Sequence, residues 1–512
     1  MSAASGTGFL AGAPHRGAGE SFRAVDPGTG SPTGPEFTSW TSAEVNEAAA
    51  QARTAFEANR ELPERWQAGL LRDLAARLGA ERDAIVETAR AETGISVARL
   101  DGELTRTRNQ LSGFADVVEG DGFGEPVHDP ADASATPPRP DLRRMLVPVG
   151  PVAVFGASNF PLAFSVAGGD TASALAAGAP VLVKGHPSHP GTSEVVGACV
   201  AEAVAACGAH PGTFALVQGA GTEPGSALVT APEVRAVGFT GSYAGGRALT
   251  ALAAGRPEPI PVFAEMGSLN PVFVTTAATG ARLDAVAEGF VASMTLGAGQ
   301  LCTKPGIVFT TAGREFATRA AALLAESEPG PLLNRATLDA FESGIRIPAA
   351  EVVTTAGPRT GPGLRTAPVL ALARLADLRR EPALLEEHFG PFAVVVDVDS
   401  DDDFLDAARL LPGSLTATVH SEPEDHERLR PLVTELVERA GRLVHNGFPT
   451  GVSVSGAQTH GGPFPATSDS AHTSVGWTAI RRFQRPVTFQ DLPEPLLPPV
   501  LRTTTSVEKE EQ

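Results

Sequence analysis

Short apolar runs alternate with longer amphipathic segments through the middle of the chain. Each run is rich in β-branched or aromatic residues, and the segments between the runs have helical content. The runs are Val152–Phe155, Pro180–Val183, Phe214–Val217, Val237–Thr240 and Val262–Ala264. Because parallel strands need crossover connections, this pattern predicts an α/β fold in which helices cover both faces of a parallel sheet. Such sheets bind ligands at the carboxyl ends of their strands.

A second alternation of strands and helices begins at Asn270. Four apolar residues spaced three, four and four positions apart predict a helix: Leu283, Val286, Phe290 and Met294. The loop LGAGQLCTKPG follows at residues 296–306, and the apolar run at 307–311 predicts a strand behind it. Similar runs continue to residue 445, which predicts a second α/β domain that carries this loop.

The loop holds one cysteine, Cys302, between glycines on one side and Pro305-Gly306 on the other. A loop held between a helix and a strand can present a nucleophilic thiol in a fixed position. Unpaired cysteine is also one of the residue types that most often fill a protein core. The loop alone therefore leaves two interpretations of Cys302, as a nucleophile or as a core residue.

Composition disfavours several classes of partner. The 512 residues include 59 Asp and Glu and 40 Lys and Arg, and the net charge of −19 disfavours nucleic acid or an anionic membrane. The uncharged stretch 145–169 is interrupted by prolines and glycines, which favours a buried strand and turn over a membrane span. Three cysteines form no disulfide framework and no metal-ligand pattern, so we expect no metal and a cytoplasmic location.

Four segments differ in composition from the two predicted domains. Residues 1–21 are rich in Gly, Ala and Ser, and residues 501–512 are polar, which predicts flexible termini. Residues 119–144 are rich in Pro, Asp and Gly, and residues 478–500 contain many prolines. These two segments predict an oligomerisation arm that lies on a neighbouring subunit.

Five ordered motifs carry a resemblance to a known family. They are GASNFPLAF (156–164), PVLVKGHPSHPGTSE (180–194), FAEMGSLNP (263–271), the cysteine loop and EEHFGPF (386–392). Together they resemble the aldehyde dehydrogenase superfamily, from about Phe22 to Phe489, and most closely its α-ketoglutarate semialdehyde (2,5-dioxovalerate) dehydrogenase branch. The resemblance implies a Rossmann-type coenzyme-binding domain over residues 22–118 and 145–264 and a catalytic domain over residues 265–466.

The resemblance assigns three catalytic residues. Cys302 becomes the nucleophile, because a thiolate adds readily to an aldehyde and gives an adduct that can expel hydride. Asn159 becomes a hydrogen-bond donor to the resulting oxyanion, although it is also placed to act as a helix N-cap. Glu265 lies in an apolar run, where an unpaired carboxylate has a raised pKa, and it becomes the base that activates water. A buried structural acid is the alternative for Glu265.

The resemblance also assigns the site of a nicotinamide cofactor. Lys184 matches the lysine that holds the adenosine ribose, and Glu387 matches the residue that holds the nicotinamide ribose, with Phe389 beside the ring. The full implied set is Lys184, Ser158, His186, Pro187, Gly221, Gly225, Gly241, Ser242, Glu387 and Phe389. The run Gly219-Ala-Gly221 with Gly225 is one residue longer than a dinucleotide fingerprint, so an ordinary turn is the alternative there.

The choice between NADP and NAD depends on Pro187. Many NAD-using relatives have a carboxylate three residues after the lysine, and Pro187 stands there instead, so nothing at that position repels a 2′-phosphate. Glu223, in the nearby turn, would oppose a phosphate. On balance the sequence favours NADP, with NAD also usable.

Substrate contacts are implied for four residues. Ala163 and Ala167 are small and, by analogy with the family, face the substrate tunnel from a helix after Asn159, next to Phe160. Arg144 precedes the strand that leads to Asn159 and is a candidate to bind a distal carboxylate, although arginines in such positions more often form surface or subunit ion pairs.

These residues together predict an enzyme that oxidises an aldehyde to a carboxylic acid through a thiohemiacetal and a thioester. α-Ketoglutarate semialdehyde is the expected substrate, and a broad-specificity or long-chain aldehyde dehydrogenase is the alternative. A coenzyme-A-acylating relative would lack the base supplied by Glu265, and a non-catalytic relative would not need Cys302. We expect a homodimer or a homotetramer.

Overall fold

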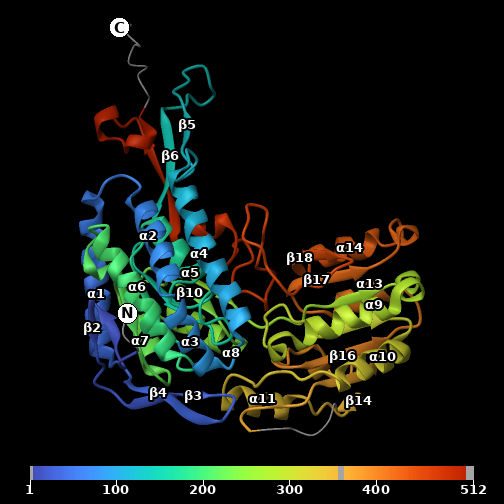
Figure 1. Cartoon of the computed structure of the whole chain (residues 1–512). Helices are drawn as coiled ribbons and strands as arrows, with labels where there is room; N and C mark the ends of the chain where they lie inside the picture. Colours follow the sequence, from blue (N-terminus) through green and yellow to red (C-terminus); the bar gives the residue numbers. More distant parts are fainter. Residues whose placement is uncertain (1–3, 356–361, 503–512) are drawn as a thin grey trace, which may run out of the picture.

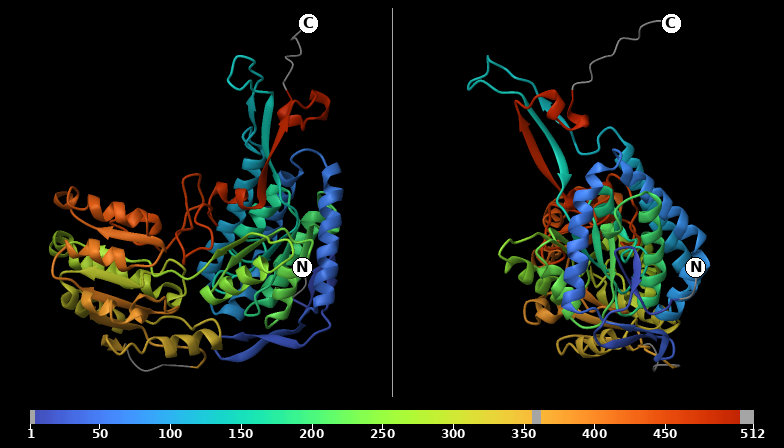
Figure 2. Two further views of the ribbon diagram at one scale, coloured as in Figure 1. Left: turned by 180° about the vertical axis from the view of Figure 1, so that it is seen from behind. Right: turned by 90° about the vertical axis from the view of Figure 1, so that its left-hand side faces the viewer.

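The computed structural model describes residues 4–355 and 362–502. Two seven-stranded sheets, each covered by helices, lie side by side, and a small three-stranded sheet projects from the first part (Figures 1 and 2). None of the described helices combines the length and the apolar character that crossing a bilayer requires. The predicted α/β fold with parallel sheets is confirmed.

The first sheet has the strand order β11-β10-β7-β8-β9-β1-β2. Its strands are β1 (Gly8–Leu10), β2 (Ala13–His15), β7 (Val152–Phe155), β8 (Val181–Lys184), β9 (Phe214–Val217), β10 (Ala236–Thr240) and β11 (Val262–Glu265). The five strands β7 to β11 are parallel. Along the chain, β8 and β9 add to one side of β7, and β10 and β11 add to the other. The winding therefore reverses between β7 and β10, the place where open α/β sheets bind their ligands.

Alternate residues of these strands enter two separate cores. Val152 and Val154 pack with one group of helices, whereas Ala153 packs with the other. The first group is α2 (Trp66–Ala80), α3 (Arg82–Thr93), α4 (Val97–Glu119), α5 (Gly169–Ala177) and α6 (Pro190–Ala206). The second is α1 (Ser42–Ala58), α7 (Glu223–Thr230) and α8 (Tyr243–Ala254). Because both faces are buried, these strands are mostly apolar, and the polar residues Lys184, Thr240 and Glu265 stand only at their carboxyl ends.

The second sheet has the order β14-β15-β16-β13-β12-β17-β18 and is parallel except at β14. Its strands are β12 (Val272–Val274), β13 (Ile307–Thr310), β14 (Glu351–Thr355), β15 (Val369–Arg374), β16 (Phe392–Asp397), β17 (Ser414–His420) and β18 (Ala440–His445). Its helices are α9 (Thr276–Thr295), α10 (Gly313–Ala325), α11 (Arg335–Gly344), α12 (Leu375–Leu378), α13 (Asp403–Leu410) and α14 (Arg430–Val437). The loop that carries Cys302 connects α9 to β13.

Two smaller antiparallel units complete the chain. β3 (Ser21–Asp26) and β4 (Ser31–Thr38) form a hairpin. β5 (Val127–Asp129), β6 (Leu142–Pro148) and β19 (Gln484–Gln490) form the projecting sheet, which stands away from both domains (Figure 2). The segments expected to form the arm thus contribute all of β5 and β19.

The expectation of a flexible leader over residues 1–21 is wrong for residues 4–21. β1 pairs with β9, and the side chain of Glu194 accepts hydrogen bonds from backbone and side-chain groups of Ser5 and Thr7. The Gly- and Ala-rich composition hid a short edge strand. Residues 1–3, and residues 503–512 of the predicted C-terminal tail, lie outside the described residues.

The helix expected directly after Asn159 begins only at Gly169. Residues 161–168 form successive turns instead. The reason is a buried carboxylate: Glu103 Oε1 accepts hydrogen bonds from the backbone N–H groups of Leu162 and Ala163, at 2.8 and 2.9 Å. A partner from α4 thus takes backbone donors at the point where a new helix would start.

A buried ion pair joins the C-terminal part of the chain to the first sheet. Arg482 Nη1 lies 2.8 Å from Asp170 Oδ1, and both side chains are less than a tenth exposed. Arg482 also donates to Ser173 Oγ on α5. The pair fixes the segment that follows residue 474.

We expect Asp170→Ala to lower the free energy of unfolding by about 3 to 5 kcal/mol, because it leaves the Arg482 guanidinium buried without a counter-charge. Calorimetry or chemical denaturation of the variant measures this loss. Asp116→Ala, which breaks an exposed pair with Arg72, is the control and should cost less than about 1 kcal/mol. Equal losses in the two variants would contradict a special role for the buried pair.

Candidate active site

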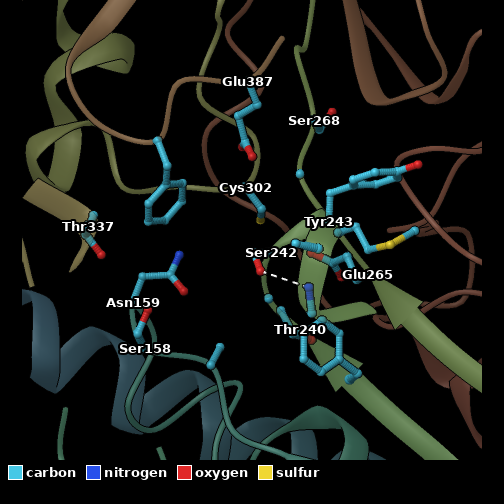
Figure 3. Close-up of a pocket in the computed structure, with 18 of the residues that line it drawn as sticks. Ser158, Asn159, Thr240, Ser242, Tyr243, Glu265, Ser268, Cys302, Thr337 and Glu387 are labelled. Carbon is cyan, nitrogen blue, oxygen red and sulfur yellow. Dashed lines mark hydrogen bonds between the residues drawn. The ribbon is translucent and has the colours of Figure 1, made fainter. Parts of the chain in front are cut away.

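A cavity of about 1130 Å³ opens at the carboxyl ends of β7, β10 and β11 and extends to the second domain. It lies at the reversal of winding between β7 and β10. Figure 3 shows side chains from both domains turned toward it, with Cys302 near the centre. The predicted residues that line it are Ser158, Asn159, Phe160, Lys184, His186, Gly241, Ser242, Glu265, Cys302, Glu387 and Phe389.

The loop that presents Cys302 has an unusual backbone. Gly297, Ala298 and Gly299 all have positive φ, at 60°, 57° and 69°. Three left-handed residues in a row are unfavourable for residues other than glycine, so the two glycines make this turn accessible. The side chain of Asn270 then holds the loop, because its Nδ2 donates to the backbone oxygens of Cys302 and Lys304.

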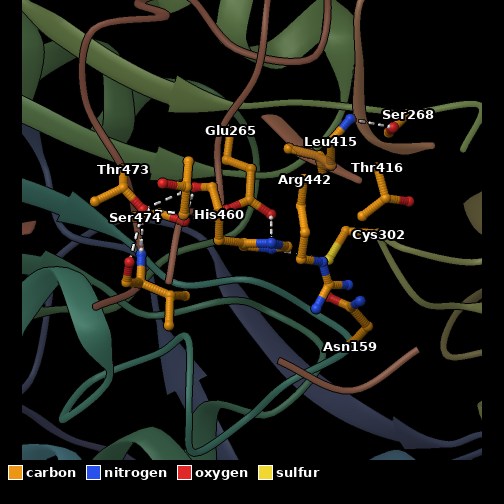
Figure 4. A network of polar contacts seen from close by, with 12 residues as sticks. Asn159, Glu265, Ser268, Cys302, Leu415, Thr416, Arg442, His460, Thr473 and Ser474 are labelled. Carbon is orange, nitrogen blue, oxygen red and sulfur yellow. Dashed lines mark hydrogen bonds and ion pairs between the residues drawn. The ribbon is translucent and has the colours of Figure 1, made fainter. Parts of the chain in front are cut away.

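Cys302 meets two other reactive groups. His460 Nε2 lies 3.4 Å from Cys302 Sγ and 3.0 Å from Glu265 Oε1 (Figure 4). One ring nitrogen, the sulfur and one carboxylate oxygen of these residues all lie within 4.8 Å of one another. Glu265 ends β11, whereas His460 comes from the segment after the second sheet. Glu265 and His460 are almost completely buried. A thiol, an imidazole and a carboxylate are thus within proton-transfer reach of one another.

The segment around Ser474 holds this cluster in place. Ser474 Oγ donates to Glu265 Oε2, and the His460 backbone N–H donates to Thr473 Oγ1 at 2.8 Å (Figure 4). The backbone N–H of Ser474 also donates to His460 O at 2.9 Å. Two irregular segments, around residues 460 and 474, therefore fix His460 and Glu265, the two partners of the thiol.

The surroundings shift the pKa values of the two acidic groups, Cys302 and Glu265, in opposite directions. Burial and the adjacent Glu265 carboxylate raise the pKa of the Cys302 thiol well above its usual value. Burial alone would also raise the pKa of Glu265, but His460, Ser474 and the thiol stabilise its carboxylate and lower its pKa overall. The expectation of a raised pKa for Glu265 is therefore wrong, because the carboxylate has partners that the sequence did not reveal. At neutral pH the resting site holds a thiol beside an ionised carboxylate.

Asn159 follows β7 and lies at the wall of the cavity. Its Nδ2 donates to the backbone oxygen of Gln300 at 2.9 Å, and its own backbone oxygen accepts from Arg99 Nη2 at 2.8 Å. The first bond fixes the direction of the amide and leaves its second N–H for another acceptor. The alternative N-cap role is excluded by the turns that follow Asn159.

Glu387 lies on the opposite wall of the cavity from Asn159 in Figure 3. Burial raises its pKa to about 7, although the charge of Lys304 opposes this rise. Its carboxylate packs against Gly267, where an added Cβ would lie 2.2 Å from Glu387 Oε2. Lys304 is itself fully buried and donates to the backbone oxygen of Phe392 at 2.6 Å.

The end of β8 and the start of α8 form the far part of the cavity. Lys184 is buried, with its Nζ donating to the backbone oxygens of Gly185 and Gly219. Ser242 caps α8 by accepting from the N–H of Gly245 at 3.2 Å (Figure 3). The first backbone N–H groups of α8 therefore face the cavity, an arrangement that suits a phosphate.

Six predicted contacts are not brought to the cavity wall: Pro187, Gly221, Gly225, Ala163, Ala167 and Arg144. Ala163 and Ala167 are buried in the core, because the turns after Phe160 direct Phe164 to the cavity in their place. Arg144 is exposed on β6 in the projecting sheet, where it pairs with Thr488. The strand after Arg144 leads toward Asn159, but its length separates the two residues.

Sequence reasoning missed His460, Ser474 and Asn270. Asn270 lies inside the motif FAEMGSLNP, so its position was visible although its role was not. His460 and Ser474 come from a segment without periodicity, and only the fold brings them to β11. The pair Gly461-Gly462 after His460 was the one local signal of a close backbone approach: an added Cβ at Gly462 would lie 2.3 Å from Ser414 O.

Comparison with known proteins gives concordant matches. The aldehyde dehydrogenase family model matches residues 15–463. The chain is 48% identical over 491 residues to alpha-ketoglutaric semialdehyde dehydrogenase 2 of Azospirillum brasilense, covering 94% of this chain and 93% of that protein. It is 41% identical over 488 residues to alpha-ketoglutaric semialdehyde dehydrogenase of Acinetobacter baylyi, covering 92% and 91%.

Solved structures resemble the fold at lower sequence identity. The structure of 3,6-anhydro-L-galactose dehydrogenase gives a TM-score of 0.82 at 21% identity, over 94% of this chain and 99% of that one. A variant of aldehyde dehydrogenase C from Pseudomonas syringae, in complex with NAD+ and octanal, gives 0.80 at 20% identity, over 94% and 96%. These likenesses confirm the fold.

We expect Glu265→Gln to make Cys302 alkylate several-fold faster at pH 8. The carboxylate raises the pKa of the thiol, so its removal lowers that pKa and increases the thiolate fraction. The measurement is the rate of iodoacetamide labelling at Cys302 by mass spectrometry, from pH 6 to 10.

Glu87→Gln, at an exposed position on α3, is the control and should leave the labelling rate unchanged. Slower labelling of Glu265→Gln would mean that the carboxylate instead draws the proton from the thiol in the resting protein.

Proposed function

Because the chain belongs to the aldehyde dehydrogenase family and oxidises an aldehyde to the acid, we propose that its substrate is α-ketoglutarate semialdehyde. The observation that carries this proposal is the 48% identity, over nearly the full chain, with a protein named for that substrate. Cys302 and Glu265 line the cavity with His460 in contact with both, and this arrangement supports the same reaction.

The first step is addition of the Cys302 sulfur to the aldehyde carbon. The thiol proton passes to the ionised Glu265 carboxylate and from there to solvent, and the new C–S bond leaves negative charge on the former carbonyl oxygen. The free N–H of the Asn159 amide stabilises that oxygen, and one such donor is typically worth about 3 to 4 kcal/mol. The product of this step is a thiohemiacetal on Cys302.

The residues around the cavity fit a nicotinamide dinucleotide. The N-terminus of α8 with Ser242 suits the pyrophosphate, Lys184 suits the adenosine ribose and Glu387 suits the nicotinamide ribose. A dinucleotide held by these residues would supply the acceptor for the hydride that leaves the thiohemiacetal carbon. We assign the binding of this cofactor to residues 22–118 and 145–264 and the chemistry to residues 265–466.

Glu265 completes the cycle by releasing the acid. The thioester that remains on Cys302 is attacked by water, and the Glu265 carboxylate, ionised at neutral pH, accepts a proton from that water. The C–S bond then breaks, and the Cys302 thiolate takes that proton from Glu265, which returns both groups to their resting forms. The product is the free carboxylic acid.

We propose NADP as the favoured form of the cofactor. Pro187 offers no carboxylate in the turn after β8. Glu223, the residue expected to oppose a 2′-phosphate, instead accepts hydrogen bonds from the backbone N–H and the hydroxyl of Ser42 at 3.2 and 2.9 Å. Its carboxylate is therefore directed to the start of α1, which weakens the argument against NADP.

We also propose that the protein is a homodimer or a homotetramer. The projecting sheet supports this proposal, because β5 lies at its edge with all three residues exposed. An exposed strand edge is suited to pair with another chain.

The central test is reduction of NADP, followed at 340 nm, with α-ketoglutarate semialdehyde and with hexanal. We expect at least tenfold higher kcat/KM for the semialdehyde. Cys302→Ala should lose about four orders of magnitude of activity, because no other residue replaces the nucleophile. Cys207→Ala is the control and should keep full activity. Equal kcat/KM for both aldehydes would reject the substrate assignment.

Pro187→Glu tests the cofactor assignment. A carboxylate at this position should lower kcat/KM with NADP by about a hundredfold and leave NAD nearly unaffected, because it repels the 2′-phosphate. Pro187→Gln, which changes shape without charge, is the control. The proposal of NADP contact near residue 187 fails if both variants behave alike.

A further inference from the structure

Arg106 has a guanidinium without hydrogen-bond partners at its outer end. The residue lies on α4, and both Nη1 and Nη2 are buried from solvent with no acceptor among the described residues. A buried guanidinium normally uses most of its five donors, because an unmade hydrogen bond to a charged group costs free energy. The structure thus contains a cationic donor pair that lacks an acceptor.

The position of this guanidinium is fixed from two sides. Arg106 Nε donates to the backbone oxygen of Val452 at 3.4 Å, and Arg106 Cζ lies 5.1 Å from the centre of the Phe164 ring. Phe164 in turn lines the cavity, and its ring centre is 6.3 Å from that of His460. A chain of contacts therefore leads from Arg106 through Phe164 to the residue beside the Cys302 sulfur.

A second arginine, Arg442, extends toward Cys302 from β18. Arg442, on β18, donates from Nη1 to Gly451 O at 3.1 Å and from Nη2 to Pro449 O, while its Nε has no partner among the described residues. Figure 4 shows its side chain extending toward Cys302 and Asn159. Both guanidinium groups are near enough to the Cys302 sulfur to interact electrostatically with it when it is ionised. Both arginines thus hold the 449–452 segment through its backbone oxygens.

Glu103 does not satisfy the Arg106 donors. Its Oε1 accepts the backbone N–H groups of Leu162 and Ala163, and its Oε2 has no hydrogen-bond partner among the described residues. Glu103 therefore offsets the charge of Arg106 at longer range and leaves the two Nη groups to another acceptor. The acceptor that fits a guanidinium fork best is a carboxylate.

We propose that Arg106 binds the distal carboxylate of the substrate, with Arg442 adding a second positive charge beside it. This inference rests on the proposed function and deepens it, because it assigns the substrate class to aldehydes that carry a carboxylate at the far end. Arg106 thus takes the role that the sequence had suggested for Arg144. Since the Nη groups are shielded from solvent, the irregular segment 449–452 shifts when the carboxylate enters.

The test compares a charged and an uncharged aldehyde of equal chain length. Arg106→Met should lower kcat/KM for α-ketoglutarate semialdehyde by about a hundredfold or more, mainly through KM, because it removes a charge-assisted hydrogen-bonded pair. The same variant should keep kcat/KM for pentanal within about threefold of the unaltered protein. Arg106→Lys keeps the charge but loses the fork, so its loss for the semialdehyde should be intermediate.

Arg108→Met is the matched control, because Arg108 lies on the same helix and is exposed. It should leave both aldehydes unaffected. A second readout needs no turnover: glutarate should protect Cys302 from iodoacetamide in the unaltered protein, and this protection should disappear in Arg106→Met. Equal losses for pentanal and the semialdehyde would show that Arg106 only supports the fold, and no loss for either would place the carboxylate elsewhere.

Failure of the substrate assignment can be told apart from failure of this inference. If the unaltered protein prefers another carboxylate-bearing aldehyde, such as succinic semialdehyde, and loses that preference in Arg106→Met, the carboxylate site stands and only the chain length is revised. If the unaltered protein does not distinguish charged from uncharged aldehydes, both proposals fail.

Discussion

Two acidic groups share one small buried space in this protein, and both cannot carry a full charge there at low cost. The Cys302 thiol and the Glu265 carboxyl compete for one proton, because each raises the pKa of the other when it is ionised. His460 lies between them and Ser474 binds the outer oxygen of Glu265, so the carboxylate is favoured and the thiol keeps its proton. The resting site thus holds the Cys302 thiol in its neutral form.

This constraint explains why so many separate segments converge on one point. Glu265 comes from the last strand of the first sheet, Cys302 from the second domain, and His460 and Ser474 from the chain that returns between them. Asn270 fixes the cysteine loop through two backbone oxygens. Groups that share a proton must lie at hydrogen-bond distances. Residues 466–468 pair with β11, which brings the flanking residues His460 and Ser474 to Glu265 at the end of that strand.

The sequence was sufficient for those features that periodicity or a local motif encodes. Apolar runs gave the strands β7 to β11, and the motifs around Asn159, Glu265 and Cys302 placed three residues that do meet on one cavity. Contacts between distant segments were not accessible in this way. His460 has no local sequence signature. The path of residues 161–168 depends on Glu103, which belongs to another helix. Arg144 lies far from the cavity because it belongs to a sheet whose third strand, β19, comes from near the end of the chain.

The strand pair β1 and β2 has a consequence for whether the first sheet can extend into another molecule. These strands cover the outer edge of β9, an apolar strand whose backbone groups would otherwise be unpaired on that side. A bare edge of this kind is a template for growth of a sheet from one molecule into the next. The short hairpin, anchored by Glu194, therefore serves as a guard against aggregation, and its exposed, proline-containing second strand is a poor partner for further addition.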